Sequence, residues 1–205
     1  MSAQPSNDQL DLLREAANIG AGNAATALSE LLGVRVRMRI PDVRVVPFHE
    51  LPESVGGTEA AVMAMYFRLQ GDMGGSMYVL MQRETAQRFV GKLLSESSSD
   101  ALDSEMECSA LSEVGNIVAG TYLGALSDFA GVKLYPSVPY LAFDMAGAVL
   151  SVGAAEIGAS ADEALLIETE ISTGDVSANT HVLLLPQPDQ LPVLFQALGV
   201  SVSGR

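Results

Sequence analysis

A four-residue motif occurs twice in this chain at the same spacing, and this repetition limits the folds open to it. Each copy has an Asp or Ser, a Glu four residues later, an Asn three residues after that, and a Pro after 22 further residues. The copies are Asp11, Glu15, Asn18 and Pro41, then Ser109, Glu113, Asn116 and Pro139. They lie 98 positions apart (113 − 15 and 139 − 41). A repeat of this length favours two fused copies of one unit over a solenoid array.

We therefore expect one domain over residues 1–205 that contains two repeats, at about 7–95 and 104–199. The segment 96–103 is rich in Ser and Asp and is the predicted linker between the repeats.

Each copy of the motif is predicted to lie on a long helix with two distinct faces. Apolar side chains recur every three or four residues and form one stripe, while the motif residues share another. A Glu and an Asn three positions apart on a helix have Cβ atoms about 5–6 Å apart. A carboxylate and a carboxamide should therefore project together from each helix, on a face separate from the buried stripe.

Capping signals indicate where these helices begin and end. Ser6 and Ser104 are each followed three residues later by Gln or Glu, which is the pattern of a capping box. The first helix is predicted to run from about residue 7 to Leu32, with Gly33 as its C-terminal stop. The second helix is expected to follow Ser104.

The Glu–Asn pair has an ordinary explanation and a functional one. An exposed Glu and Asn on a helix are usually just solvated, and Asn is a mediocre helix former. Recurrence of the pair in both copies, while many other positions differ, favours a function. Part of the match is inherited from the duplication itself.

Alternating residues at 34–40 predict a half-buried strand after the first helix, and 132–138 is its counterpart in the second repeat. The exposed face of the first strand would carry Arg35, Arg37 and Arg39. Such a row is typical of a solvated sheet face or of an anion site. Pro41 cannot donate a central ladder hydrogen bond, so it predicts a strand break or a sheet edge.

The remaining segments alternate between strand and helix patterns. The predicted elements are a crossover at 47–57, strands at 60–69, 76–82, 163–171 and 181–185, and helices at 85–94 and 191–198. The expected fold class is α/β in an α+β-like arrangement, in which antiparallel strands from both repeats form an extended sheet and two long helices cover one face.

Composition and charge restrict the partners. The net charge is −14, which opposes long-range attraction to nucleic acid or to anionic membranes. A single cysteine, Cys108, excludes an intramolecular disulfide framework and is predicted to be a small buried side chain. No signal-like leader and no run of 18 apolar residues occur, so a soluble cytoplasmic protein is predicted.

The chain carries no recognisable nucleophile or metal-ligand pattern. His49 and His181 lie far from the motifs in sequence, and Glu-x-x-Asn lacks the imidazole of a Glu-x-x-His diiron site. Gly20-Ala-Gly22 is not preceded by a strand and is interpreted as close helix packing rather than a phosphate cradle. What remains is a carboxylate and a carboxamide that act on a group supplied by a partner.

The paired motif resembles the signature of the CheC/CheX/FliY chemotaxis phosphatases, which take part in two-component signalling. Two intact copies in one chain, and the segment from Asn18 to Thr26, are most similar to the CheC type. The resemblance covers essentially the whole chain. It implies a pseudo-two-fold α/β sandwich with a six-stranded sheet.

The resemblance also implies a reaction and roles for the motif residues. The substrate would be the aspartyl phosphate of the response regulator CheY. The two asparagines would orient the attacking water, and the two glutamates would pair with a lysine of the regulator. Mg²⁺ would belong to the regulator, with no cofactor intrinsic to this chain. Asp11 and Ser109 would have supporting roles, and Pro41 and Pro139 structural ones.

A second partner is implied, the receptor deamidase CheD. The apolar segment that begins at Asp144 has no equal in the first repeat, and an unpaired apolar surface often marks an interface. Asp144 is therefore the candidate CheD contact, while an ordinary buried helix is the alternative for most of this segment. The alternative function is a non-catalytic module that docks a response regulator or CheD. A free-standing small-molecule phosphatase is disfavoured by the missing nucleophile and metal ligands.

Overall fold

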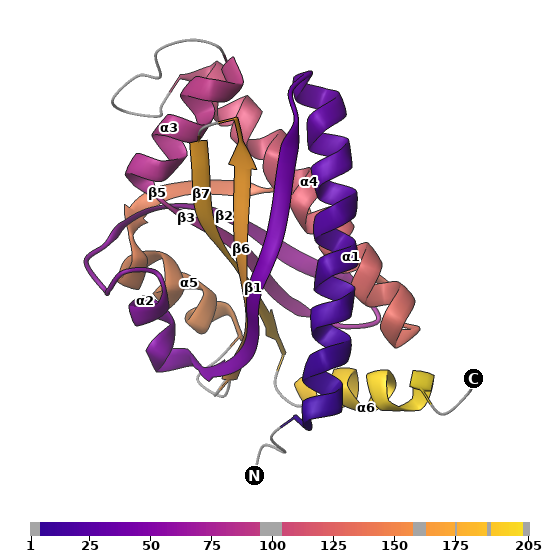
Figure 1. Cartoon of the computed structure of the whole chain (residues 1–205). Coiled ribbons are helices and arrows are strands. Elements are labelled where there is room, and N and C mark those ends of the chain that lie inside the picture. Colours follow the sequence, from indigo (N-terminus) through magenta and orange to yellow (C-terminus); the bar gives the residue numbers. More distant parts are fainter. Residues whose placement is uncertain (1–4, 95–103, 158–162, 175, 188–189, 203–205) are drawn as a thin grey trace.

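The computed structural model describes residues 5–94, 104–157, 163–174, 176–187 and 190–202. The predicted linker at 96–103 lies outside the described residues. Two 26-residue helices, α1 (Asn7–Leu32) and α4 (Glu105–Ala130), are the longest elements (Figure 1). Both begin at a Ser with a complete capping box, and both end at a left-handed Gly, as the sequence predicted for α1.

One antiparallel sheet runs through the molecule. Its strands are β1 (Val36–Pro47), β2 (Ala61–Gly71), β3 (Gly75–Gln82), β4 (Leu134–Pro136), β5 (Tyr140–Met145), β6 (Glu163–Thr173) and β7 (Val176–Pro186). The order across the sheet is β1-β6-β7-β3-β2-β4, and β5 also pairs with β2. Because β4 pairs with Leu69–Gly71 and β5 with Ala61–Tyr66, these two segments share one edge position. The predicted six-stranded, antiparallel sheet is confirmed.

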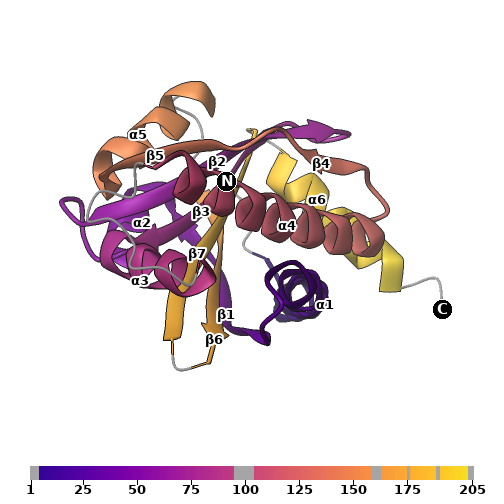
Figure 2. The ribbon, with the colours of Figure 1, turned by 90° about the horizontal axis from the view of Figure 1, so that it is seen from above.

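Helices cover the two faces of the sheet unequally. The larger core lies between the sheet and α1, α3 (Arg83–Leu94), α4 and α6 (Gln190–Val202). The smaller core lies on the opposite face, under α2 (Leu51–Ser54) and α5 (Ala146–Ile157). Figure 2 shows α1 and α4 together on one side of the sheet, with α5 on the other side. A short 3-10 helix, Phe48–Glu50, precedes α2 in the predicted crossover.

The strands that follow the two long helices differ from the prediction. The first does not end at Pro41: β1 continues to Pro47, with a register shift between Arg39 and Asp42. Of the two alternatives predicted for Pro41, the sheet edge is confirmed, because β1 is the outermost strand and one of its sides makes no ladder hydrogen bonds. The second predicted strand, 132–138, is reduced to the three residues of β4.

Two smaller expectations concern burial and membrane insertion. Cys108 is half-buried on α4, less enclosed than predicted. Across the part of the chain that the structure describes, no helix has both the length and the apolar character needed to span a membrane.

Candidate functional site

The two Glu–Asn pairs lie on the outer surfaces of α1 and α4. Glu15 and Asn18 are exposed on α1, while Ala16 and Ala17 between them are buried. The second copy has the same pattern of exposure, because Glu113 and Asn116 are exposed and the two residues between them are buried. The arrangement predicted from helical periodicity is therefore present on both helices.

The two helices pack directly against each other and cross at an oblique angle (Figures 1 and 2). In Figure 1, α1 rises from the N-terminal end of the chain, while α4 descends beside it. A Cβ atom on Gly20 would lie 3.0 Å from the Cα of Tyr122, so the helix backbones approach closely here, and Gly20 has the packing role predicted for it. Both asparagines lie near the middle of their helices, and each precedes this crossing on its own helix.

Serine side chains attach both helices to the strands that follow them. The Ser29 hydroxyl accepts a hydrogen bond from the Val36 amide at 2.9 Å. The Ser127 hydroxyl accepts the equivalent bond from the Leu134 amide at 3.0 Å. Both bonds span seven residues, and they fix the exit of each helix relative to the sheet. Ser29 and Ser127 occupy the same position of the repeat (127 − 29 = 98), which is the signal in the sequence that could have indicated this pair.

The motif positions around the pairs are not equivalent in the two copies. In the first copy, Arg14 lies 3.1 Å from Asp11 and 3.5 Å from Asp42, so it links α1 to β1 beside Pro41. At the corresponding position of α4, Ser112 donates to the carbonyl of Cys108 within its own helix. The ionic link between helix and strand is thus a feature of the first copy.

The two motif prolines lie at irregular points of the sheet. Pro41 is exposed at the register shift of β1, and Pro139 is half-buried between β4 and β5. Neither contributes a reactive group. Pro41 lies within a strand that continues past it, whereas Pro139 lies between two strands.

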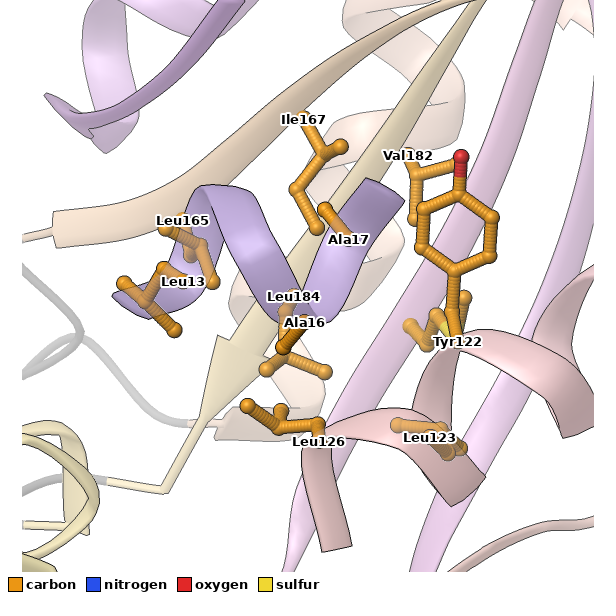
Figure 3. A pocket seen from close by; sticks show the side chains of 11 residues that line it. Leu13, Ala16, Ala17, Tyr122, Leu123, Leu126, Leu165, Ile167, Val182 and Leu184 are labelled. Atoms are coloured by element: carbon orange, nitrogen blue, oxygen red, sulfur yellow. The ribbon is translucent and has the colours of Figure 1, made fainter. Parts of the chain in front are cut away.

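A small apolar cavity lies behind the site, between α1, α4 and the sheet. It has a volume of about 20 Å³, and Figure 3 shows Leu13, Ala16 and Ala17 of α1 facing it together with Tyr122 and Leu126 of α4. An apolar cavity of this size is dry and holds no polar ligand. The Glu and Asn side chains of the motif instead lie on the exposed surface of the helices and do not line this cavity.

A separate polar cleft of about 850 Å³ lies between β1, α2, α3, β6 and β7. Its lining carries both signs of charge, including Arg39 and Arg88 with Glu168 and Glu170. Arg39 and Glu170 pair at 2.7 Å, and this guanidinium lowers the pKa of Glu170. The arginines of β1 are solvent-exposed, in agreement with a solvated face. Among the residues described, no three His, Cys, Asp or Glu side chains gather closely enough to hold a metal ion.

Comparisons with known proteins identify the family of this chain. The model of the CheC-like family matches residues 9–44 and 106–141, which contain both copies of the motif. The chain is 38% identical over 200 residues to the CheY-P phosphatase CheC of Bacillus subtilis, covering 95% of this chain and 96% of that protein. This chain belongs to the CheC-like family.

Solved structures with little sequence identity share the fold. Thermotoga maritima FliY superposes with a TM-score of 0.77 at 15% identity, covering 98% of this chain and 100% of that one. A chain of the CheX–CheY–BeF3–Mg²⁺ complex of Borrelia burgdorferi superposes with a TM-score of 0.50 at 21% identity, covering 84% and 96%.

Proposed function

We propose that this protein is a phosphatase that hydrolyses the aspartyl phosphate of the response regulator CheY. The observation that carries the proposal is the exposed Glu-x-x-Asn pair, present on both α1 and α4. The likeness to a named CheY-P phosphatase over most of the chain supports it. We also propose that the chain is one domain of two repeats, joined by the linker at 96–103.

Asn18 and Asn116 each orient the attacking water. A carboxamide accepts one hydrogen bond from a water and donates another, so it can direct a lone pair of the water oxygen at phosphorus. The water oxygen forms the new bond to phosphorus, the bond from phosphorus to the aspartyl oxygen breaks, and the products are free carboxylate and inorganic phosphate. Phosphoryl transfer depends mainly on such positioning and on charge stabilisation.

Glu15 and Glu113 hold the partner through its cation. Each lies one turn before the Asn on the same helix face, where it can pair with the regulator's lysine. In this proposal the regulator supplies Mg²⁺, and the presence of Mg²⁺ in the solved CheX–CheY–BeF3–Mg²⁺ complex supports it. This division of roles suits a convex, acidic surface that presents a carboxylate and an amide. Asp11 and Ser109 support the sites, and Pro41 and Pro139 shape the adjoining strands.

We propose CheD as a second partner, bound near Asp144. This residue is exposed at the end of β5, and its carboxylate accepts a hydrogen bond from the Met145 amide at 2.7 Å. Part of the following helix, α5, packs into the core, because Ala146, Val149 and Leu150 are buried. Met145 and Val152 remain exposed and are available for a partner.

The test is the decay of phosphorylated CheY from the same organism with a small fraction of an equivalent of this protein. A phosphatase releases many equivalents of phosphate per protein molecule. A docking module, the alternative function, changes the decay only in proportion to the complex it forms. If a small fraction of an equivalent of this protein does not accelerate the decay, the docking module becomes the favoured function.

A further inference from the structure

Five glycines lie within α1 and α4, and packing explains only some of them. They are Gly20, Gly22, Gly115, Gly120 and Gly124. Glycine destabilises a helix interior relative to alanine, so each one needs a reason. A Cβ on Gly20 would meet the backbone of Tyr122, and one on Gly115 would clash with Met65. These two glycines are required by the fold.

Gly22 and Gly120 have no such reason within the chain. Apart from its chain neighbours and the nearby backbone of its own helix, a Cβ at either position would have no atom within 4 Å, and both residues are exposed. Each lies four residues after the asparagine of its own site, which places it one turn further along the same helix face. The two are equivalent in the repeat (120 − 22 = 98).

A close approach by the partner would explain both glycines. Asparagine is the shorter of the two carboxamide side chains, so its amide reaches a buried phosphoryl group only if the partner lies almost on the helix backbone. A side chain one turn away would hold the partner off. On the other side of each asparagine is the Glu, which carries the charge. Ile19, 41% exposed beside Asn18, adds apolar surface to the first site.

We propose that Gly22 and Gly120 are positioning residues, at which the backbone of the response regulator rests directly on α1 and α4. The regulator is the occupant because these positions continue the surface of the proposed sites, and the inference rests on that proposed function. Without a Cβ, the partner's phosphorylated pocket comes within reach of the asparagine amide. Each glycine thus lowers the stability of its helix and permits the contact.

The fifth glycine provides a matched control. Gly124 also has no neighbour within 4 Å of a Cβ, so it is equally unexplained by packing. Its equivalent in the first copy is Thr26 (124 − 98), which means that one of the two sites already carries a side chain there. Gly124→Thr should therefore leave turnover unchanged within about twofold.

The experiment compares two double variants, Gly22→Ala/Gly120→Ala and Gly22→Thr/Gly120→Thr, with the wild type and with Gly124→Thr. The measurements are kcat/KM on phosphorylated CheY, affinity for CheY saturated with BeF3 and Mg²⁺, and thermal unfolding. The alanine pair should raise the unfolding midpoint, by about 1–4 °C per site, and yet lower kcat/KM about tenfold. The threonine pair should lower kcat/KM about 100-fold, because small displacements at a reacting centre are costly.

Opposite shifts in stability and activity distinguish a contact with the partner from a structural role. Folded double variants with wild-type kcat/KM and wild-type affinity would overturn the inference. Failure of the proposed function has a different signature, namely that the wild-type protein itself does not turn over phosphorylated CheY. In that case the affinity measurement still decides the role of the glycines, since weaker binding by both double variants supports it and unchanged binding overturns it.

Discussion

The hydroxyl of Tyr122 lies 3.0 Å from the hydroxyl of Thr169, and both are buried between α4 and β6. The same tyrosine is the residue against which Gly20 of α1 packs. One side chain therefore joins the second site helix to the sheet at the point where the two helices cross. Burial raises the pKa of Tyr122 far above its usual value, so the phenol stays neutral.

Removing this hydroxyl should cost stability and leave the chemistry intact. Tyr122→Phe breaks the bond and leaves the Thr169 hydroxyl buried without this partner, at an expected loss of about 1 kcal/mol in the free energy of unfolding. Urea denaturation measures the loss. The double variant Tyr122→Phe/Thr169→Val is the control, because replacing both partners should recover much of the stability. An equally large loss in the double variant would show that packing, and not the hydrogen bond, is responsible.

A half-buried histidine of β7, His181, should make the stability of the protein depend on pH. The pKa of His181 is lowered mainly by burial, and further by Arg44, while Glu168 across the strand pair opposes the shift. In the unfolded chain this histidine binds a proton near pH 6.5, whereas in the folded chain it does so only at lower pH. The contribution of neutral His181 to the free energy of unfolding is therefore fully present above pH 6.5 and is lost as the pH falls below that value. His181→Gln should weaken this dependence.

The measurement is urea denaturation at about pH 7.5 and about pH 5.5. His49→Gln is the matched control, since the His49 side chain is exposed on the surface. An unchanged difference between the two pH values in His181→Gln would assign the dependence to other groups.

Local signals allowed much of the fold to be predicted. The two long helices begin at the predicted capping serines, and α1 ends at the predicted Gly33, because caps depend on residues within one turn. The outward direction of Glu15 and Asn18 follows from helical periodicity alone. For Pro41 the sequence left a strand break and a sheet edge open, because the effect of a proline depends on which side of its strand is paired. Pro41 lies on an outer strand, where the ladder shifts and continues.

Contacts between distant segments could not be predicted. The link from Arg14 to Asp42 joins residues 28 positions apart, and no periodic pattern indicates it. Gly20 and Gly22 look alike in sequence, yet only Gly20 meets a neighbouring helix. The helix crossing that separates their roles is a tertiary feature. The roles of the two Glu–Asn pairs remain predictions, because their chemistry depends on a partner.

The isolated protein should need no metal of its own. We expect no stoichiometric divalent ion after purification, and no hydrolysis of generic phosphate monoesters, because in the proposed mechanism the regulator supplies both the metal and the phosphoryl group. Elemental analysis and an assay with a chromogenic monoester, with and without added Mg²⁺, measure these quantities. Tight binding of Mg²⁺, Zn²⁺ or Mn²⁺, or vigorous monoesterase activity, would contradict the proposed division of roles.

Charge reversal at the end of β5 should separate the two proposed partners. Asp144→Lys is expected to weaken CheD binding while CheY dephosphorylation stays close to wild type, because Asp144 is exposed and lies on neither site helix. Titration calorimetry with CheD measures the affinity. Asp128→Lys, an exposed charge reversal on α4, is the matched control. Unchanged affinity of the Asp144 variant would remove this residue from the interface.

Single and double replacement of the asparagines should reveal whether both sites work. Asn18 and Asn116 lie on different helices, each with its own Glu, so neither needs the other to orient a water. Asn18→Ala and Asn116→Ala should each silence one site, by about 10²-fold, and leave the activity of the other. The double variant should fall to the autodephosphorylation rate of the regulator.

The two sites need not contribute equally to this result. The ionic link from Arg14 to Asp11 and Asp42 holds α1 against β1, whereas Ser112 at the equivalent position of α4 bonds within its own helix. If this link orients the first site, Arg14→Ala should lower the activity that remains in Asn116→Ala and spare the activity that remains in Asn18→Ala. The decay of phosphorylated CheY measures each variant, with circular dichroism as the check on folding. A folded Asn18→Ala/Asn116→Ala protein with wild-type turnover would remove both asparagines from the mechanism.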